Sequence, residues 1–375
     1  MFKFKQANNP LGLDMSGMSL KLVQLTGRGD NLNVQAYADL PVPKEVFSED
    51  IIKDSALLVR TIKKALAIPH FGKFTTTDVV ASIPEIKSFV RVIQMPEVSE
   101  EEAAEAIPWE AEAYFPMPIS QVYLDWMILP HTAVSVGPTN QTEVTGKKMT
   151  VLIIASPRDY VDDFTRVLKE AGLRPLALEV ESQATARSLV SRADETVLIM
   201  DINTLRTSMI IYDKDTLEFT SSIPVAGKIF TDSISRSLGV SFEEAEKLKR
   251  KYGLDEAAEK GMPRKALIPV LNNLLGEVKN TMRFFEEHAP ADTKISRLLL
   301  CGGSSKLKHL PSFLHDQFTH SESPEHPLRS LPGMKVELAN PWIKVLKKKQ
   351  TPPMSREDSL SYATAIGLAL RETEA

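Results

Sequence analysis

Two aspartates in this chain each end an apolar run and precede a short polar turn. The first, Asp14, lies in Leu11-Gly-Leu-Asp-Met-Ser-Gly-Met-Ser-Leu-Lys21, where a turn of small residues leads into a second apolar run. Small residues let the backbone of such a turn approach an anion, so that its N–H groups can bind phosphate. Asp14 could then hold a hydrated Mg²⁺, and Lys21 could neutralise phosphate charge. An ordinary hairpin with a surface aspartate would produce the same pattern.

The second aspartate, Asp201, repeats this arrangement later in the chain. It ends the apolar run Thr196-Val-Leu-Ile-Met-Asp201, a polar turn follows over residues 202–206, and an apolar run resumes at Thr207. A further apolar run, Ile295-Ser-Arg-Leu-Leu-Leu-Cys-Gly-Gly303, ends in two glycines. The duplicated strand–aspartate–turn–strand pattern indicates an internal repeat and favours a phosphate site over two unrelated hairpins.

Length and composition narrow the class of protein. The 375 residues suffice for two domains, and 43% hydrophobic and 25% charged residues are typical of a globular protein. A net charge of −4 gives no reason to expect nucleic-acid binding, and a single cysteine, Cys301, excludes a disulfide framework or a cysteine-based zinc cluster. The N-terminus lacks the apolar core of a signal peptide and no run is long enough to span a membrane, so we expect a cytoplasmic protein.

The spacing of apolar residues predicts alternating strands and helices. Beyond the runs named above, strands are expected over residues 34–38, 77–83, 88–95, 123–129, 149–156, 207–212, 216–223 and 334–338. Helices are expected over residues 49–66, 158–171, 182–193, 227–238, 241–252, 265–288, 307–318 and 359–371. Another helix should begin at Ser99, the first residue of the capping box Ser99-Glu-Glu-Glu102, and break or kink near Pro108. Residues 88–180 form a small predicted α+β unit that interrupts the first domain.

Several segments carry a family resemblance. Besides the segment that ends at Lys21, they are Ile107-Pro-Trp-Glu-Ala-Glu-Ala-Tyr-Phe-Pro116, Leu124-Asp-Trp126, Glu179-Val-Glu-Ser-Gln-Ala-Thr-Ala-Arg187, Leu300-Cys-Gly-Gly-Ser304 and Tyr362-Ala-Thr-Ala-Ile-Gly-Leu-Ala-Leu-Arg371. Over nearly its whole length the chain resembles the PilM family of type IV pilus assembly proteins, in the FtsA-like branch of the actin-like ATPase superfamily. The Ile-Pro-Trp-Glu helix is the most specific part of the resemblance.

The resemblance implies an α/β protein with the actin-like ATPase fold. Two lobes would each contain a duplicated twisted sheet with flanking helices, and an FtsA-like α+β subdomain would be inserted in the first. The implied domains are a first lobe of residues 1–87, completed by 181–199 and the C-terminal helix 356–375, an insert of residues 88–180, and a second lobe of residues 200–355 with a helical part at about 240–290.

The resemblance also implies ATP and Mg²⁺ in the cleft between the lobes, with Asp14 and Asp201 facing each other across the metal and the phosphates. The implied nucleotide-binding residues are Ser16, Gly17, Ser19, Lys21, Asn203, Thr204, Glu246, Lys249, Gly302 and Gly303. Glu246 and Lys249 would equally suit a solvated i,i+3 pair. The first turn departs from the family's Asp-Ile-Gly-Ser pattern at Met15 and Ser16, and Asn203 replaces the usual glycine of the second, so we expect weak or absent ATP hydrolysis.

In PilM-like proteins the insert and its neighbouring lobe form a groove for the N-terminal cytoplasmic tail of PilN, a membrane-anchored partner. The aromatic residues Trp109, Tyr114, Phe115 and Trp126 could contact that tail or form the core of the insert. The expected function is therefore a scaffold of pilus or type II secretion-like assembly, tied to the inner membrane through its partner. Self-association and contact with other assembly proteins stay open, as do two alternative functions: an FtsA-like cell-division protein and a metabolite kinase of the same fold.

Overall fold

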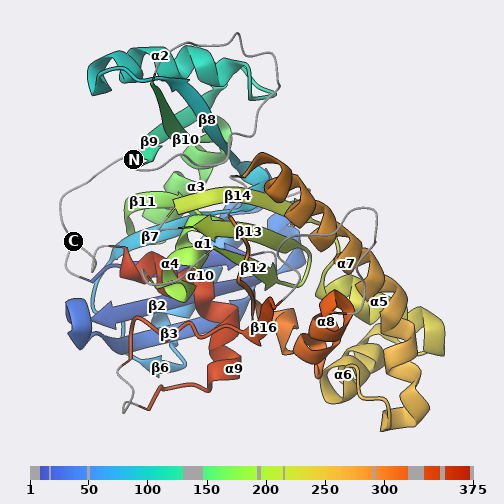
Figure 1. Ribbon diagram of the computed structural model, residues 1–375. Coiled ribbons are helices and arrows are strands. Elements are labelled where there is room, and N and C mark those ends of the chain that lie inside the picture. The colour runs from blue at the N-terminus through green and yellow to red at the C-terminus, as the bar shows by residue number, and fades with distance from the viewer. Residues whose placement is uncertain are drawn as a thin grey trace.

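The computed structural model of the chain describes residues 9–16, 18–48, 51–129, 147–191, 196–213, 216–289, 293–319, 333–346 and 351–371. Two large sheets, a smaller third sheet and flanking helices make up the molecule (Figure 1). No helix in these segments combines the length and the apolar character that crossing a bilayer requires.

The first large sheet has six strands in the order β11-β7-β1-β2-β3-β6. Their bounds are β1 (Leu11–Ser16), β2 (Ser19–Thr26), β3 (Asn33–Pro41), β6 (Phe71–Gly72), β7 (Asp78–Ile83) and β11 (Arg174–Val180). The hairpin of β1 and β2 is antiparallel and places Asp14 opposite Lys21, whereas β1 runs parallel to β7. The predicted strand–aspartate–turn–strand unit is therefore confirmed.

The second large sheet repeats this topology in the order β14-β13-β12-β15-β16. Its strands are β12 (Val197–Ile202), β13 (Thr207–Asp213), β14 (Thr216–Ile223), β15 (Arg297–Cys301) and β16 (Lys335–Leu338). The antiparallel pairs β12–β13 and β13–β14 correspond to β1–β2 and β2–β3, and the parallel pair β12–β15 corresponds to β1–β7. The internal repeat predicted from Asp14 and Asp201 is thus present in the strand pairing.

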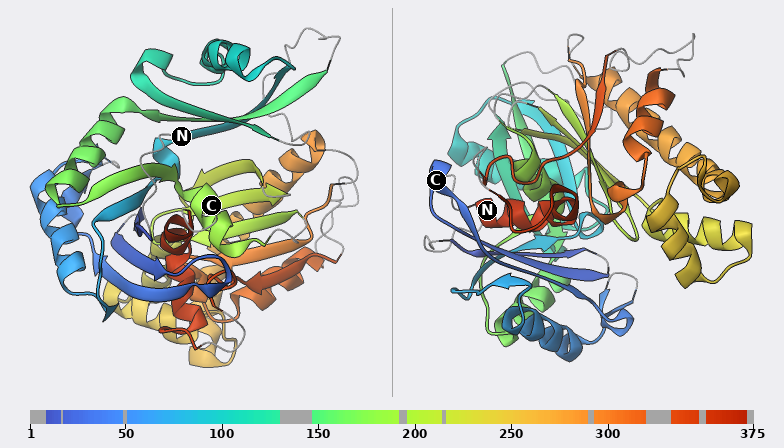
Figure 2. Two further views of the ribbon diagram at one scale, coloured as in Figure 1. Left: turned by 90° about the vertical axis from the view of Figure 1, so that its left-hand side faces the viewer. Right: turned by 90° about the horizontal axis from the view of Figure 1, so that it is seen from below.

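Two helices, α4 (Glu181–Leu189) and α10 (Ala363–Leu370), lie between the large sheets, as Figure 2 shows. Their packing is so close that a Cβ added to Gly367 would lie 1.7 Å from the carbonyl oxygen of Ala184. A Cβ added to Gly12 of β1 would lie 2.0 Å from the carbonyl oxygen of Ala365. The predicted single C-terminal helix is divided into α9 (Arg356–Ser359), a 3₁₀ turn at Leu360–Tyr362 and α10.

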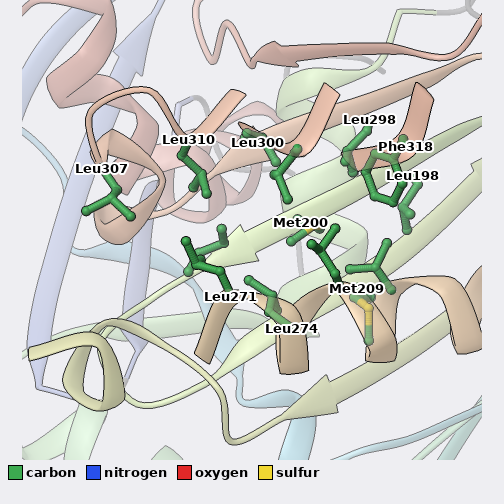
Figure 3. Packing of buried hydrophobic residues seen from close by; sticks show 14 of the residues in the cluster. Leu198, Met200, Met209, Leu271, Leu274, Leu298, Leu300, Leu307, Leu310 and Phe318 are labelled. Carbon is green, nitrogen blue, oxygen red and sulfur yellow. The ribbon is translucent and has the colours of Figure 1, made fainter. Parts of the chain in front are cut away.

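The outer faces of the two large sheets are covered by other helices. Those helices are α1 (Ser55–Ala67) and α3 (Arg158–Glu170) on the first sheet, and α5 (Gly227–Leu238), α6 (Phe242–Tyr252), α7 (Met262–His288) and α8 (Leu310–Thr319) beside the second. Alternate residues of each strand face opposite sides, so Met200 of β12 joins the outer core while Ile199 faces α4. Figure 3 shows Leu271 and Leu274 of α7 pointing toward Met200 and Met209.

The first outer helix begins later than the sequence predicts. Helical periodicity predicts a helix from residue 49, but β5 (Ile51–Ile52) pairs with β4 (Phe47–Ser48), and α1 starts at Ser55. Asp54 caps it, because its carboxylate accepts a hydrogen bond from the backbone N–H of Leu57 at 2.8 Å. The two isoleucines fit both a helix and a strand pattern, and the cap decides where the helix begins.

The third sheet has the order β8-β10-β9 and is covered on one face by α2 (Glu100–Glu112). Its strands are β8 (Phe89–Pro96), β9 (Val122–Leu129) and β10 (Lys148–Pro157). The predicted capping box is confirmed: Ser99 Oγ accepts from the N–H of Glu102 at 3.3 Å, and the Glu102 carboxylate accepts from the N–H of Ser99 at 3.0 Å. The helix runs on through Pro108 to Glu112.

The segment after the third sheet returns to the first lobe. Strand β11 pairs with β7 in the six-stranded sheet, and Phe164 and Leu168 of α3 lie in the same core as Leu58 and Ile62 of α1. The domain bounds implied by the resemblance stay a prediction, but α3 and β11 both belong structurally to the first large sheet rather than to the three-stranded one.

Candidate functional site

The hairpin of β1 and β2 buries Asp14 and Lys21 side by side. Asp14 is 2% exposed, and its Oδ1 accepts a hydrogen bond from Ser82 Oγ at 3.0 Å. Ser82 Oγ in turn accepts from the backbone N–H of Met15 at 3.3 Å, which fixes the end of β1. Lys21 donates to the hydroxyl of Ser19. The structure thus brings together Asp14, Ser19 and Lys21 of the predicted site.

Two other residues of the first turn are less fully placed. Ser16 ends β1, and its Cα lies opposite that of Ser19 in the strand pairing. Gly17 lies outside the described residues.

Asp201 occupies the matching position in the second hairpin, against Gly302. It is 6% exposed, and its carboxylate is hydrogen bonded by the side chain of Asn203. Gly302 has a φ of +84°, and a Cβ added there would lie 2.4 Å from Asp201 Oδ1 and 2.5 Å from the carbonyl oxygen of Ile202. Both the backbone conformation and the lack of space therefore require glycine here.

Backbone hydrogen bonds join the second turn to the start of α5 and to the double-glycine loop. The carbonyl oxygen of Asn203 accepts from the N–H of Gly227 and from Ser304 Oγ, both at 3.0 Å. The carbonyl oxygen of Thr204 accepts from the N–H of Lys228 at 2.8 Å. The N–H of Asn203 itself donates to the carbonyl oxygen of Arg206 at 3.0 Å, so this N–H is already used inside the turn.

Glu246 and Lys249 form an ion pair against the first turn of α5. Lys249 Nζ lies 2.7 Å from Glu246 Oε2 and donates to the carbonyl oxygen of Gly227 at 3.0 Å and to Thr231 Oγ1 at 2.8 Å. Burial acts to raise the pKa of Glu246, but the hydrogen bonds from Lys249, Thr231 and Arg250 bring that pKa down to about 2. Lys249 is buried, which lowers its pKa. Lys249 is thus buried and Glu246 only half-buried, and through Gly227 the pair connects to Asn203 and the double-glycine loop.

Buried and half-buried carboxylates gather where the two hairpins approach each other. Burial and the charge of Asp14 raise the pKa of Asp201 to about 6, with smaller opposing contributions from Asn203 and Lys21. Burial, followed by the charges of Asp14, Asp201 and Glu85, raises the pKa of Glu181 well above its ordinary value. Ionised carboxylates in such a cluster repel one another, and a bound cation would relieve that repulsion.

Glu181 was missed as a site residue, although it lies in the Glu179–Arg187 segment that carries the resemblance. It is the first residue of α4, directly after the end of β11. The signal available in the sequence was a carboxylate at a strand-to-helix junction, directly after an apolar run.

The described residues hold no group of three or more histidine, cysteine or carboxylate side chains placed to bind a metal by themselves. Mg²⁺ rarely needs such a group, because it is commonly held by one or two carboxylates together with water and phosphate oxygens. Asp14 and Asp201, with Lys21 beside them, fit that requirement. Their negative charges repel each other, and a cation between them would stabilise the ionised forms.

A separate cavity of about 300 Å³ lies between β9 of the third sheet and the first lobe, and we call it the insert groove. Its apolar lining includes Ile83, Leu124, Ile154, Leu176, Leu178 and Val180, and its polar lining includes Tyr123, Asp125, Asp162, Thr165, Lys169, Glu179 and Gln183. The hydroxyl of Tyr123 donates to Asp162 Oδ1 at 3.0 Å, and the guanidinium of Arg158 lies 4.4 Å from the ring centroid of Tyr123. These contacts join β9 to α3 at the wall of the insert groove.

The four aromatic residues named from the sequence lie away from the insert groove. Phe115 is buried in the core between α2 and the third sheet, and Tyr114 and Trp126 pack against that core. Trp109 is 78% exposed. None of the four is among the residues that line the insert groove, because α2 covers the opposite face of the sheet. Their contact with a partner stays a prediction.

A family model described as type IV pilus assembly protein PilM matches residues 12–373. The chain belongs to the PilM family. A chain of the PilM–PilN type IV pilus biogenesis complex is 28% identical to this PilM-family chain, with a TM-score of 0.77, and the match covers 99% of this chain and 100% of that one. The expected actin-like fold is confirmed.

More distant matches show the breadth of this fold. MreB5 of Spiroplasma citri, solved bound to AMPPNP, is 12% identical, with a TM-score of 0.51 and coverage of 97% of this chain and 95% of that one. The cell division protein FtsA of Bacillus subtilis (strain 168) is 23% identical over 278 residues. That alignment covers 67% of this chain and 61% of FtsA, so the chain spans less than two thirds of this relative.

Proposed function

We propose that this PilM-family chain is a scaffold of type IV pilus assembly on the cytoplasmic face of the inner membrane. It binds the N-terminal tail of a PilN-like membrane protein in the insert groove. The observation that carries the proposal is the insert groove itself, which lies between the third sheet and the first lobe, where the family resemblance expects a tail. The end-to-end similarity to a chain of the PilM–PilN complex supports the choice of partner.

The walls of the insert groove favour an extended peptide. Strand β9 is an edge of the third sheet and β11 is an edge of the six-stranded sheet, and both contribute lining residues. Edge strands offer backbone groups to an added chain, while pockets between them select side chains. Apolar side chains of the tail would contact Leu124, Ile154 and Leu176. A basic side chain would be favoured near Asp125 and Asp162.

The proposal is tested by calorimetry of the full-length chain against a synthetic peptide of the PilN-like tail from the same organism. We expect saturable binding. Asp162→Arg should weaken it at least tenfold, which corresponds to about 1.4 kcal/mol. The neighbouring exposed residue supplies the control, since Asp163→Arg makes the same charge change outside the insert groove. Absence of saturable binding, or an equal loss in both variants, would refute the proposal.

We further propose that the cleft between the two hairpins binds ATP with Mg²⁺. Asp14 and Asp201 would hold the metal, and Lys21 would neutralise phosphate charge. Bound Mg²⁺ would offset the negative charge of both the phosphates and the carboxylates. Gly302, Gly303 and the Glu246–Lys249 pair would border the nucleoside. Because the N–H of Asn203 is engaged by Arg206, the second turn offers fewer donors to phosphate, which supports weak or absent hydrolysis. Phosphate release from ATP by the purified chain should stay near the uncatalysed background, and steady turnover would contradict this point.

A further inference from the structure

The molecule carries two exposed faces of opposite charge, and one of them surrounds the end of α1. We define the α1–β6 face by Arg60, Lys63, Lys64, Ile68, Phe71 and Lys73. Ile68 is 62% exposed and Phe71 is 42% exposed, so both offer apolar surface to a partner. Residues 55–77 include no aspartate or glutamate. This surface therefore combines two exposed apolar side chains with four basic ones.

The second face lies on the outside of α2. We define the α2 face by Glu100, Glu101, Glu105, Trp109, Glu110 and Glu112. Residues 97–121 include no lysine, arginine or histidine. Trp109 projects from this acidic surface with 78% of its area exposed. Glu105 and Glu112 lie four residues before and three residues after it, so all three side chains share one side of the helix.

The two faces complement each other and lie on separate parts of the molecule. Figure 1 places α2 at the top, α1 at middle height and β6 near the bottom. They therefore cannot meet within one copy. Acidic and basic faces steer two molecules into register, and a tryptophan surrounded by apolar partners is a common anchor of an interface.

We propose that the α2 face of one copy docks onto the α1–β6 face of a second copy, with Trp109 against Ile68 and Phe71. A contact between two different faces leaves each copy with one free face, so the assembly extends head to tail. The insert groove lies on the other side of the third sheet from α2, so a bound tail leaves the α2 face accessible. The proposal is independent of the proposed function.

Sedimentation velocity of the full-length chain tests the proposal. The sedimentation coefficient should rise with protein concentration at low ionic strength. It should not rise in about 1 M salt, where the Debye length falls to about 3 Å. Lys63→Glu with Lys64→Glu should abolish the rise by cancelling the positive charge of the basic face, and Glu105→Lys with Glu112→Lys should abolish it by removing most of the negative charge of the acidic face. The control, Lys308→Glu with Lys335→Glu, changes the net charge as the first variant does, at exposed sites outside both faces.

Mixing the two face variants gives a sharper result. The Lys63/Lys64 variant keeps a native α2 face and the Glu105/Glu112 variant keeps a native α1–β6 face, so an equimolar mixture should associate although neither variant associates alone. A native chain that stays monomeric at low salt would overturn the proposal, and so would face variants that associate as the native chain does. Binding of the monomeric native chain to anionic vesicles, lost in the Lys63/Lys64 variant, would assign the α1–β6 face to a membrane and equally overturn it.

Discussion

At the residue scale, the central feature is the pair of buried aspartates that the two hairpins bring toward each other. Asp201 has a pKa raised to about 6 by burial and by Asp14, so it ionises less readily than an isolated aspartate. A cation between the two carboxylates would reverse that effect. The sequence pointed to both aspartates because each ends an apolar run, and the strand pairing places each at the corresponding point of its hairpin.

The nucleotide proposal leads to a direct prediction for Asp201. Asp201→Asn should lower the affinity for a fluorescent ATP analogue in the presence of Mg²⁺ at least tenfold, or about 1.4 kcal/mol, because one of the two metal-holding charges is lost. The exposed Asp163→Asn variant should bind as the native chain does. Unchanged affinity of the Asp201 variant would contradict the assigned role, and native binding that does not depend on Mg²⁺ would contradict the metal.

The Glu246–Lys249 pair predicts a pH-dependent contribution to stability. The folded pKa of Glu246, about 2, lies below the ordinary value of 4.5. The stabilisation is therefore fully present above pH 4.5 and is lost as the pH falls toward 2. Glu246→Gln should lower the free energy of unfolding at neutral pH, because Lys249 stays buried without its counter-ion, and the difference from the native chain should shrink on acidification.

Urea unfolding at about pH 7 and about pH 3.5 measures that difference. Glu243→Gln, at an exposed position of the same helix, is the matched control and should change stability little at either pH. A loss in the Glu246 variant that is equally large at both pH values would show that ionisation of Glu246 does not provide the stabilisation.

At the scale of elements, the two central helices determine how the lobes are joined. Gly367 of α10 faces the backbone of α4, and an added Cβ would overlap the carbonyl oxygen of Ala184. Gly367→Ala should therefore destabilise the chain by about 1–3 kcal/mol, because the helices must separate or distort. Gly276→Ala is the matched control: it lies inside α7 with no atom within 4 Å of the added Cβ, and should stabilise by about 0.4–1 kcal/mol. Equal stability of both variants in chemical unfolding would contradict the close packing.

Local sequence patterns predicted whether a segment is a helix or a strand, and they predicted where a helix begins when a capping motif was present. The Ser99 capping box located the start of α2 because its hydrogen bonds are local. The start of α1 was misjudged, because Ile51 and Ile52 continue the helical spacing although they lie in β5, a strand that ends before the Asp54 cap. Apolar periodicity alone does not distinguish those two outcomes over so short a run.

At the scale of the whole molecule, the duplicated hairpins predicted the two-sheet architecture, but the insert groove could not be predicted in detail. Its lining comes from β9, α3 and β11, which are separate in the chain and meet only in the fold. A strand pattern also does not reveal which sheet the strand joins, so β11 was expected in the inserted unit although it pairs with β7. For the same reason the sequence could not show on which face of the third sheet the aromatic residues of the Ile-Pro-Trp-Glu helix lie: α2 covers the face opposite the insert groove.

Hydrogen exchange of the full-length chain with and without the PilN-like tail peptide tests the central claim most directly. A bound tail should slow exchange in β9, α3 and β11, whose residues line the insert groove, and should leave α2 unchanged. Protection centred on α2 around Trp109, or no protection at saturating peptide, would contradict the assignment of the insert groove as the partner site.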